Sequence, residues 1–303
     1  MVSDPFAHVL DCAGRPLVLD RPRVVGIINL SPDSFSADGH GDDVEAAIDH
    51  ALRMAEDGAD MLDVGGESTR PGATEVSVEQ ELHRVMPVIE QLVARTQLPV
   101  AIDTSRPEVM RAAVAAGAGM INDVYALRRD GALDAAAELG VPVCLMHMQG
   151  EPRSMQEEPH YDDVVGEIHR FLTDRLFACE LAGMDRRQVL VDPGFGFGKT
   201  LEHNVALLSA LERFANLGGG VYVGLSRKSM LGALTGRKLP QERLAGSLAA
   251  AVMAAERGAR MIRVHDVAQT VDALAVWWAV HAQDSVPHRV ERSAAVPRWP
   301  DDD

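Results

Sequence analysis

The 303-residue chain is short of cysteine, of aromatic residues and of long apolar runs. Its three cysteines, Cys12, Cys144 and Cys179, form no CxxC pair and no His-paired zinc spacing, which excludes a disulfide framework and the common zinc motifs. No apolar stretch has the length that a bilayer crossing needs, and the first residues lack the basic and apolar segments of a signal peptide. We therefore expect a cytoplasmic protein with reduced thiols.

Positive charge is scarce as well. Lys and Arg total 29 against 45 Asp and Glu, which gives a formal net charge of −16 at pH 7. This balance argues against nucleic acid and against anionic membranes as partners. An anionic ligand must instead be held by a local cluster of basic side chains.

What the chain does have is a series of eight short apolar runs that end in polar residues. The runs and their ends are Val24–Ile28 with Asn29; Met61-Leu62 leading through Asp63-Val64 to Gly65-Gly66-Glu67; Pro99–Ile102 with Asp103; Met120-Ile121 with Asn122-Asp123; Val141–Met146 with His147; Val189–Val191 with Asp192; Val221–Leu225 with Ser226-Arg227-Lys228; and Met261-Ile262 leading through Arg263-Val264 to His265-Asp266. Such runs are typical of parallel strands buried on both faces. Because a (β/α)8 barrel builds its active site from the C-terminal ends of its strands, the sequence predicts a single α/β TIM barrel with the site there.

A repeated connection supports the barrel. Gly-Ala-x-Met occurs at Gly58–Met61, Gly117–Met120 and Gly258–Met261, each time between an amphipathic segment and an apolar run. Short connections of this kind join helices to strands in repeating β/α units. We expect residues 1–23 to form a cap or hairpin beneath the barrel, residues 24–283 to form the barrel, and residues 284–303 to be a disordered tail.

Three oxygen-bearing side chains, those of Asp103, Asn122 and Asp192, end neighbouring strands of the predicted barrel. Together they could read the donor edge of a heterocycle, because a carboxylate can pair with two N–H groups of a guanidine-like ring. The alternative is that each side chain caps the helix that follows it.

Basic groups end the last two runs. Arg263 and His265 lie on the same face in strand alternation and make a credible anion site on an acidic protein. Lys228 could donate a hydrogen bond to a carbonyl oxygen of a bound ring. A strand-end arginine can also be a salt-bridge partner, and His147 fits a core histidine better than a catalytic one.

Two loops could complete the site. Asn29 could supply an amide oxygen to Mg²⁺, which prefers oxygen ligands, although Ser31–Ser34 also reads as a turn. Thr69 and Arg70 suit a carboxylate or a phosphate, although a solvated surface arginine is the alternative. The segment Asp192–Thr200 is not a nucleotide-binding P-loop, because proline stands where the first glycine is needed.

Eight motifs in order, from about residue 24 to residue 282, resemble bacterial dihydropteroate synthase of the pterin-binding family. They are Asn29–Ser36, Gly66–Gly72, Ile102–Ser105, Ile121–Asp123, Met146–Gly150, Asp192–Lys199, Ser226–Ser229 and Arg263–Asp266. The resemblance implies condensation of (7,8-dihydropterin-6-yl)methyl diphosphate with 4-aminobenzoate, which gives 7,8-dihydropteroate and diphosphate in folate biosynthesis.

The resemblance also implies roles for individual residues. The pterin would be held by Asp103, Asn122, Asp192, Lys228, Met146 and Arg263; the diphosphate by Asn29, Arg263 and His265, with Mg²⁺ on Asn29; and the aminobenzoate by Thr69, Arg70, Pro71, Ser229, Phe35 and Phe197. No acid or base catalyst is expected, since a free arylamine is already a nucleophile. Catalysis would come from electrostatic stabilisation of the diphosphate by Arg263 and His265.

Some features leave alternatives. The first loop departs from the family pattern at Leu30-Ser31, Ala37 and His40, which leaves open a non-catalytic paralogue; a pterin-binding module of a methyltransferase is a further alternative. A homodimer is expected from the resemblance, and Trp277-Trp278 could lie either in its interface or in the core.

Overall fold

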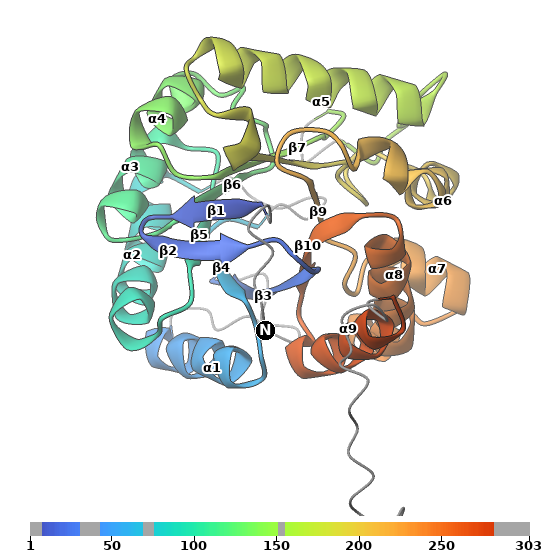
Figure 1. The fold of residues 1–303 in the computed structure, drawn as a ribbon, viewed down its shortest axis with the longest axis horizontal. Helices are drawn as coiled ribbons and strands as arrows, with labels where there is room; N and C mark the ends of the chain where they lie inside the picture. Colours follow the sequence, from blue (N-terminus) through green and yellow to red (C-terminus); the bar gives the residue numbers. More distant parts are fainter. Residues whose placement is uncertain (1–7, 31–42, 69–75, 151–154, 282–303) are drawn as a thin grey trace, which may run out of the picture.

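The computed structural model describes residues 8–30, 43–68, 76–150 and 155–281. Eight parallel strands close into a barrel in the order β10-β3-β4-β5-β6-β7-β8-β9 (Figure 1). They are β3 Arg23–Asn29, β4 Met61–Gly65, β5 Val100–Asp103, β6 Met120–Asp123, β7 Val143–Met146, β8 Val189–Asp192, β9 Val221–Val223 and β10 Ala259–Val264. The fold is therefore the single α/β TIM barrel that the sequence predicts.

Helices surround the barrel on its outside (Figure 1). They are α1 Val44–Glu56, α2 Val78–Arg95, α3 Pro107–Ala115, α4 Ala132–Leu139, α5 Val164–Leu181, α6 Leu201–Ser209, α7 Ser229–Thr235, α8 Leu244–Glu256 and α9 Val267–His281, with 3-10 turns η2 Arg186–Gln188, η3 Leu211–Phe214 and η4 Pro240–Arg243. The units after β5 and β6 are compact because α3 has 9 residues and α4 has 8. No helix in the described part of the chain combines the length and the apolar character that a membrane crossing requires.

Two strands are shorter than their apolar runs. Strand β7 begins at Val143, after Pro142, and β9 ends at Val223, before Gly224. Proline has no N–H to donate to a strand ladder, and glycine has no side chain to pack in it, so both residues favour a strand boundary.

The Gly-Ala-x-Met connections are confirmed in their geometry. Gly58, Gly117 and Gly258 have φ of +97°, +103° and +89°, a conformation that residues with a Cβ rarely adopt. Each glycine follows a helix and precedes a buried alanine at the start of the next strand segment. The repeated motif therefore ends the helix and turns the chain into the barrel.

The lower half of the barrel interior is apolar. One residue from each barrel strand joins a buried cluster with Leu10, Cys12, Leu17 and Leu19; the strand residues are Val25, Met61, Ala101, Met120, Cys144, Leu190, Tyr222 and Met261. The four N-terminal residues belong to β1 Val9–Cys12 and β2 Arg15–Val18, which pair as an antiparallel hairpin, and to the residue after it. This hairpin closes the N-terminal end of the barrel.

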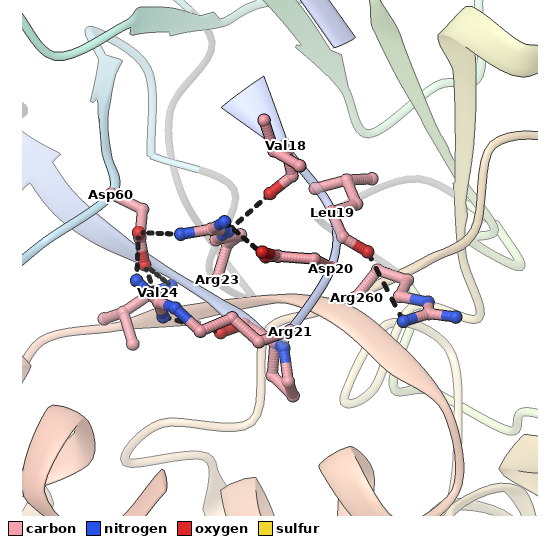
Figure 2. A network of polar contacts seen from close by, with 9 residues as sticks. Val18, Leu19, Asp20, Arg21, Arg23, Val24, Asp60 and Arg260 are labelled. Atoms are coloured by element: carbon pink, nitrogen blue, oxygen red, sulfur yellow. Dashed lines mark hydrogen bonds and ion pairs between the residues drawn. The ribbon is translucent and has the colours of Figure 1, made fainter. Parts of the chain in front are cut away.

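A polar network fastens the hairpin to the barrel (Figure 2). Asp60, just before β4, accepts from Arg21 Nη2 at 2.7 Å, from Arg23 Nη1 at 2.9 Å and from the Val24 N–H at 2.9 Å. Arg23 also donates from Nε to the Val18 carbonyl oxygen at 2.6 Å. Each charge in this network has a partner of opposite sign. The proposed division into residues 1–23, 24–283 and 284–303 stays a prediction, and residues 284–303 lie outside the described part.

Candidate active site at the C-terminal end of the barrel

The strand register brings the predicted oxygen-bearing side chains to one rim. Asp103 on β5 is paired with Asn122 on β6, and Met146 on β7 is paired with Asp192 on β8. Asn122 and Asp192 are each only 6% exposed. These polar side chains lie above the apolar interior cluster, where a ligand entering the barrel mouth would meet them.

Arg263 spans this rim from the last strand. Its Nε donates to Oδ2 of Asp63 at 2.5 Å, and its Nη2 donates to Oδ2 of Asp103 at 2.9 Å. Asn122 Nδ2 donates to the same Asp63 oxygen at 3.0 Å. The four side chains form one network that joins β10 to β4, β5 and β6.

The capping alternative is wrong for all three oxygen-bearing residues, because the helices that follow them, α3, α4 and α6, have Arg106, Gly131 and Thr200 at their N-caps. Helix α3 has Arg106 at its N-cap without a side-chain cap, so Asp103 does not cap it. Asn122 uses its amide N–H on Asp63. Asp192 Oδ1 accepts from the Gly194 N–H at 2.7 Å, which is a local turn and not a helix cap.

Sequence reasoning did not single out Asp63 as a site residue. The side chain is 0% exposed, and its Oδ1 has no hydrogen-bond partner among the described residues. A carboxylate inside the apolar run Met61–Gly65 was the available signal. Because every second side chain of a strand lies on the same face, Asp63 shares the inward face of β4 with Met61, which belongs to the interior cluster.

Burial disfavours the ionised form of the rim carboxylates of Asp103 and Asp192 and so raises their pKa values. It raises the pKa of Asp192 to about 6, an effect opposed by the Gly194 N–H and by Lys228 and Lys199. It also raises the pKa of Asp103, with Asp63 adding to the shift and Arg263 opposing it. Buried carboxylates of this kind gain from a ligand that offers N–H donors.

The glycine-rich segment after β8 packs against protein. Its three glycines, Gly194, Gly196 and Gly198, have φ of +73°, +79° and +62°. A Cβ on Gly194 would lie 1.9 Å from the carbonyl oxygen of His147, and one on Gly198 would lie 2.3 Å from that of Gln149. The glycines therefore allow this loop to approach the loop after β7 closely.

This approach positions Lys228 and an apolar wall. Nζ of Lys228 lies 4.2 Å from the centroid of the Phe197 ring, which is a cation–π contact. Phe197 packs against a buried cluster that contains Met146, Met148, Met155 and Val124. Ser229, the first residue of α7, is exposed. A flat ring could pack against this wall while Lys228 contacts its polar edge.

His147 and Lys199 form a buried pair that the sequence did not reveal. Lys199 Nζ lies 3.0 Å from His147 Nδ1, and both residues are buried. Burial, with the Lys199 charge, lowers the pKa of His147 to about 2, and the ring contacts Phe171 edge-on. These contacts support the interpretation of His147 as a core histidine.

Arg263 and His265 bond to different elements. Arg263 reaches β4 and β5, whereas His265 Nδ1 lies 3.0 Å from the Ser226 hydroxyl in the loop after β9. In the described part of the chain, Arg263 Nη1 has no hydrogen-bond partner, so it can still donate to an anion. The salt-bridge alternative and an anion-binding role are therefore compatible for Arg263.

The described residues fit a metal ion that is coordinated mainly by a bound phosphate group and by water. No group of three or more His, Cys, Asp and Glu residues suited to a metal ion occurs among the described residues. Asn29 ends β3 and is paired with Gly65 on β4. Mg²⁺ commonly binds few protein oxygens and completes its shell with phosphates and water, which suits a single amide. Phe35, Thr69, Arg70 and Pro71 lie outside the described residues.

Fold and site together define a barrel enzyme that binds a pterin. The model of the family described as "Pterin binding enzyme" matches residues 25–265. The dihydropteroate synthase of Escherichia coli strain K12 is 52% identical over 263 residues, which cover 87% of this chain and 93% of the relative. The chain belongs to the dihydropteroate synthases of the pterin-binding family and is a transferase.

Solved structures agree with this assignment. The dihydropteroate synthase of Xanthomonas albilineans with 4-aminobenzoic acid is 63% identical, with a TM-score of 0.86, and the match covers 93% of this chain and 100% of that one. The same enzyme in complex with 7,8-dihydropteroate is aligned at 61% identity with a TM-score of 0.82, over 92% of this chain and 100% of that one.

Proposed function

We propose that the C-terminal end of the barrel joins (7,8-dihydropterin-6-yl)methyl diphosphate to 4-aminobenzoate and releases 7,8-dihydropteroate and diphosphate. The observation that carries this proposal is the convergence of Asp103, Asn122 and Asp192 on one rim, where Asp103 and Asn122 join the network of Arg263. The Xanthomonas structures with 4-aminobenzoic acid and with 7,8-dihydropteroate support the choice of substrates.

The pterin pocket uses charge and shape. The buried carboxylates of Asp103 and Asp192 accept hydrogen bonds from the amino and ring N–H groups, and Asn122 supplies a further polar contact. Lys228 donates to the ring carbonyl, and Met146 supports the ring face, since a thioether packs well against a flat π-system. The N–H donors of the pterin thus meet carboxylate acceptors that folding has already removed from water.

The diphosphate end uses the basic groups of β10. Nη1 of Arg263 and the ring of His265 donate to phosphate oxygens, and Asn29 holds Mg²⁺ with its amide oxygen. When bound, Mg²⁺ neutralises charge that accumulates on the diphosphate as it leaves. Arg263 keeps its bonds to Asp63 and Asp103 during this contact, so the guanidinium couples the pterin and the diphosphate.

The aminobenzoate approaches from the side of Phe197. Phe197 and Ser229 line this approach, together with Thr69, Arg70, Pro71 and Phe35 from the two segments outside the described residues. The amine nitrogen forms a C–N bond to the exocyclic methylene, the C–O bond to the diphosphate breaks, and the nitrogen then loses one proton to solvent. Holding both reactants in line can contribute about 7–11 kcal/mol in the best models. No acid or base catalyst is assigned, because a free arylamine is already a nucleophile.

A test separates this activity from a non-catalytic paralogue. Dihydropteroate formation is measured with Mg²⁺ and with a chelator, for the wild type, Arg263→Ala and Arg260→Ala. Arg260 is a matched control, because it lies on the same strand but contacts Leu19 at the other end of the barrel. We expect metal-dependent product that falls about 100-fold or more in Arg263→Ala and stays unchanged in Arg260→Ala, since a charge-assisted contact at the leaving group is lost. Pterin binding without product would favour the paralogue, and methyl transfer would favour the methyltransferase module.

A homodimer remains part of the proposal. Trp277 packs against the main core, whereas Trp278 is 37% exposed and its neighbours on α9, Val276 and Val280, are 68% and 57% exposed. Val276 and Val280, four residues apart, share one face of α9, and an exposed apolar pair of this kind suits contact with a second copy of the chain. Light scattering of the wild type and of Val276→Glu tests it: a dimer that dissociates in the variant is expected. The cytoplasmic location and the exclusion of nucleic-acid and membrane partners stay predictions.

A further inference from the structure

The loop after β8 carries a buried ammonium group that none of the roles above uses. Lys199 is 3% exposed. Its Nζ lies 3.0 Å from Nδ1 of His147, 2.9 Å from the carbonyl oxygen of Phe197 and 3.4 Å from the carbonyl oxygen of His147. One side chain therefore joins the loop after β7 to the loop after β8.

All of these partners are neutral. Burial lowers the pKa of His147 to about 2, so its ring carries no charge and Nδ1 can accept the hydrogen bond. Burial also lowers the pKa of Lys199 to about 7. Replacing the lysine by an apolar side chain would remove the cost of a buried cation but would leave these three acceptors without their donor. The hydrogen bonds of Lys199 therefore hold the two loops in place relative to each other.

The charged groups around Lys199 belong to the proposed pterin site. Asp192 at the end of β8 raises its pKa and Lys228 after β9 lowers it. Arg128, in the loop after β6, acts with Lys199 to keep His147 neutral. From α6, Asn204 Nδ2 donates to the carbonyl oxygen of Lys199 at 3.4 Å. Among these groups Asp192 is the one acid, and Lys199 is one of the cations that favour its ionised form.

We infer that Lys199 is a positioning residue for the pterin site: its Nζ ties the Phe197 segment, whose ring contacts Lys228, to the loop after β7. This inference rests on the proposed function, because it assigns Asp192 and Lys228 to the pterin. Lys199 itself touches no substrate. Its effect reaches the ligand through the backbone at Phe197 and through the ring that Lys228 contacts.

The test uses the full chain and a dihydropterin alcohol that lacks the diphosphate, so that no phosphate ionises in the pH range. Its dissociation constant is measured from pH 5 to pH 8 for the wild type, Lys199→Met, Lys199→Arg and Lys238→Met. Lys238 is exposed before η4 and gives the same chemical change at the surface. Thermal unfolding of each variant is recorded under the same conditions.

We expect wild-type affinity to fall as pH drops below about 7, because burial raises the pKa of both pterin carboxyls, Asp103 and Asp192. Lys199→Met should bind about tenfold more weakly at pH 7.5, because the Phe197 segment loses its tie, and should move the midpoint of the acid limb upward, because a positive charge that favours ionised Asp192 is lost. Lys199→Arg should keep the midpoint near that of the wild type, and Lys238→Met should match the wild type throughout. The melting temperature of Lys199→Met should fall by a few degrees at most, because the lost hydrogen bonds are offset in part by removal of a buried cation.

Two results would overturn the inference. Lys199→Met could bind as the wild type does with the same acid midpoint, or it could lose affinity only in proportion to a lower melting temperature while the midpoint stays in place. The proposed function fails separately, if the wild type binds no pterin and forms no dihydropteroate.

Discussion

Asp60 lies just before strand β4 and Asp63 lies within it, but their side chains make contacts at opposite ends of the barrel. Asp60 accepts from Arg21, Arg23 and the Val24 N–H, and its side chain keeps 10% exposure (Figure 2). Asp63 accepts from Arg263 and Asn122, is 0% exposed and leaves one oxygen without a partner among the described residues. The lower carboxylate is fully paired, and the upper one is not.

The difference extends to each end as a whole. The lower interior is an apolar cluster closed by the β1–β2 hairpin, with its charges paired at the edge. The upper interior gathers Asp63, Asp103 and Asp192 around Arg263, and burial raises the pKa of Asp103 and Asp192. Polar groups stabilise the fold at the lower end, whereas at the upper end they are held ready for a ligand at a cost in stability.

The largest expected effect separates the two ends by activity. Asp103→Ala removes hydrogen bonds from a carboxylate to the pterin, at about 1.5–3 kcal/mol each, so kcat/KM should fall about 1000-fold. The free energy of unfolding should change little, because Arg263 keeps its ion pair with Asp63 and because the carboxylate that is removed is one whose ionised form burial disfavours. Steady-state kinetics and urea unfolding of the same preparation measure both. A variant that unfolds readily but keeps its kcat/KM would reverse the assignment of this end.

The converse change at the lower end should act on stability. Asp60→Ala leaves Arg23 without its partly buried partner and should lower the free energy of unfolding by about 2–3 kcal/mol. Its kcat/KM should stay within about twofold of the wild type, since the substitution lies at the other end of the barrel. Urea unfolding gives the first value. A large loss of kcat/KM in a folded Asp60→Ala would show that the ends are coupled.

A pair of glycines sharpens the comparison further. Gly140 has φ of +66° with nothing within 4 Å of an added Cβ, so Gly140→Ala should cost about 1 kcal/mol of backbone strain alone. Gly194 has φ of +73° and would place a Cβ 1.9 Å from the His147 carbonyl oxygen. Gly194→Ala should therefore cost more stability and also weaken pterin binding. Equal effects of the two substitutions on binding would contradict the role of the glycine-rich loop.

The smallest expected effect concerns pH. Because burial raises the pKa of Asp192 to about 6, the folded protein holds this proton more tightly than the unfolded chain. Ionisation of Asp192 therefore lowers stability as pH rises from about 4 to about 6, and the carboxylate that binds pterin is lost as pH falls below about 6. Pterin affinity should decrease up to about tenfold per pH unit there. In Asp192→Asn, affinity should be lower at pH 7.5 and should depend less on pH between 5 and 7 than in the wild type, with the remaining dependence due to Asp103, whose pKa burial also raises.

The strand ends could be predicted from the sequence because local patterns determine them. Apolar runs ending in Asp103, Asn122 or Asp192 show both where each strand lies and which end is polar. Parallel pairing then brings those ends to one rim, whatever the lengths of the intervening helices. The same patterns could not decide between capping and ligand binding, because that choice depends on contacts between strands.

Two site residues, Asp63 and Lys199, could be recognised only once the fold was known. Asp63 was read as part of a strand, and its partner Arg263 is 200 positions away in the chain. Lys199 ends the family motif Asp192–Lys199, but the sequence predicts no role for it, since its partner His147 is 52 positions away. Both are buried charges whose meaning depends on distant neighbours. The segments with Phe35 and Thr69–Pro71 lie outside the described residues, so their predicted roles stay predictions.

The most direct measurement is a crystal structure with the dihydropterin alcohol, diphosphate and Mg²⁺ bound together. The account predicts the pterin ring against Asp103, Asn122 and Asp192, with the diphosphate on Nη1 of Arg263 and no ligand at the hairpin end. A pterin bound away from this rim, or a diphosphate that does not touch Arg263, would contradict it.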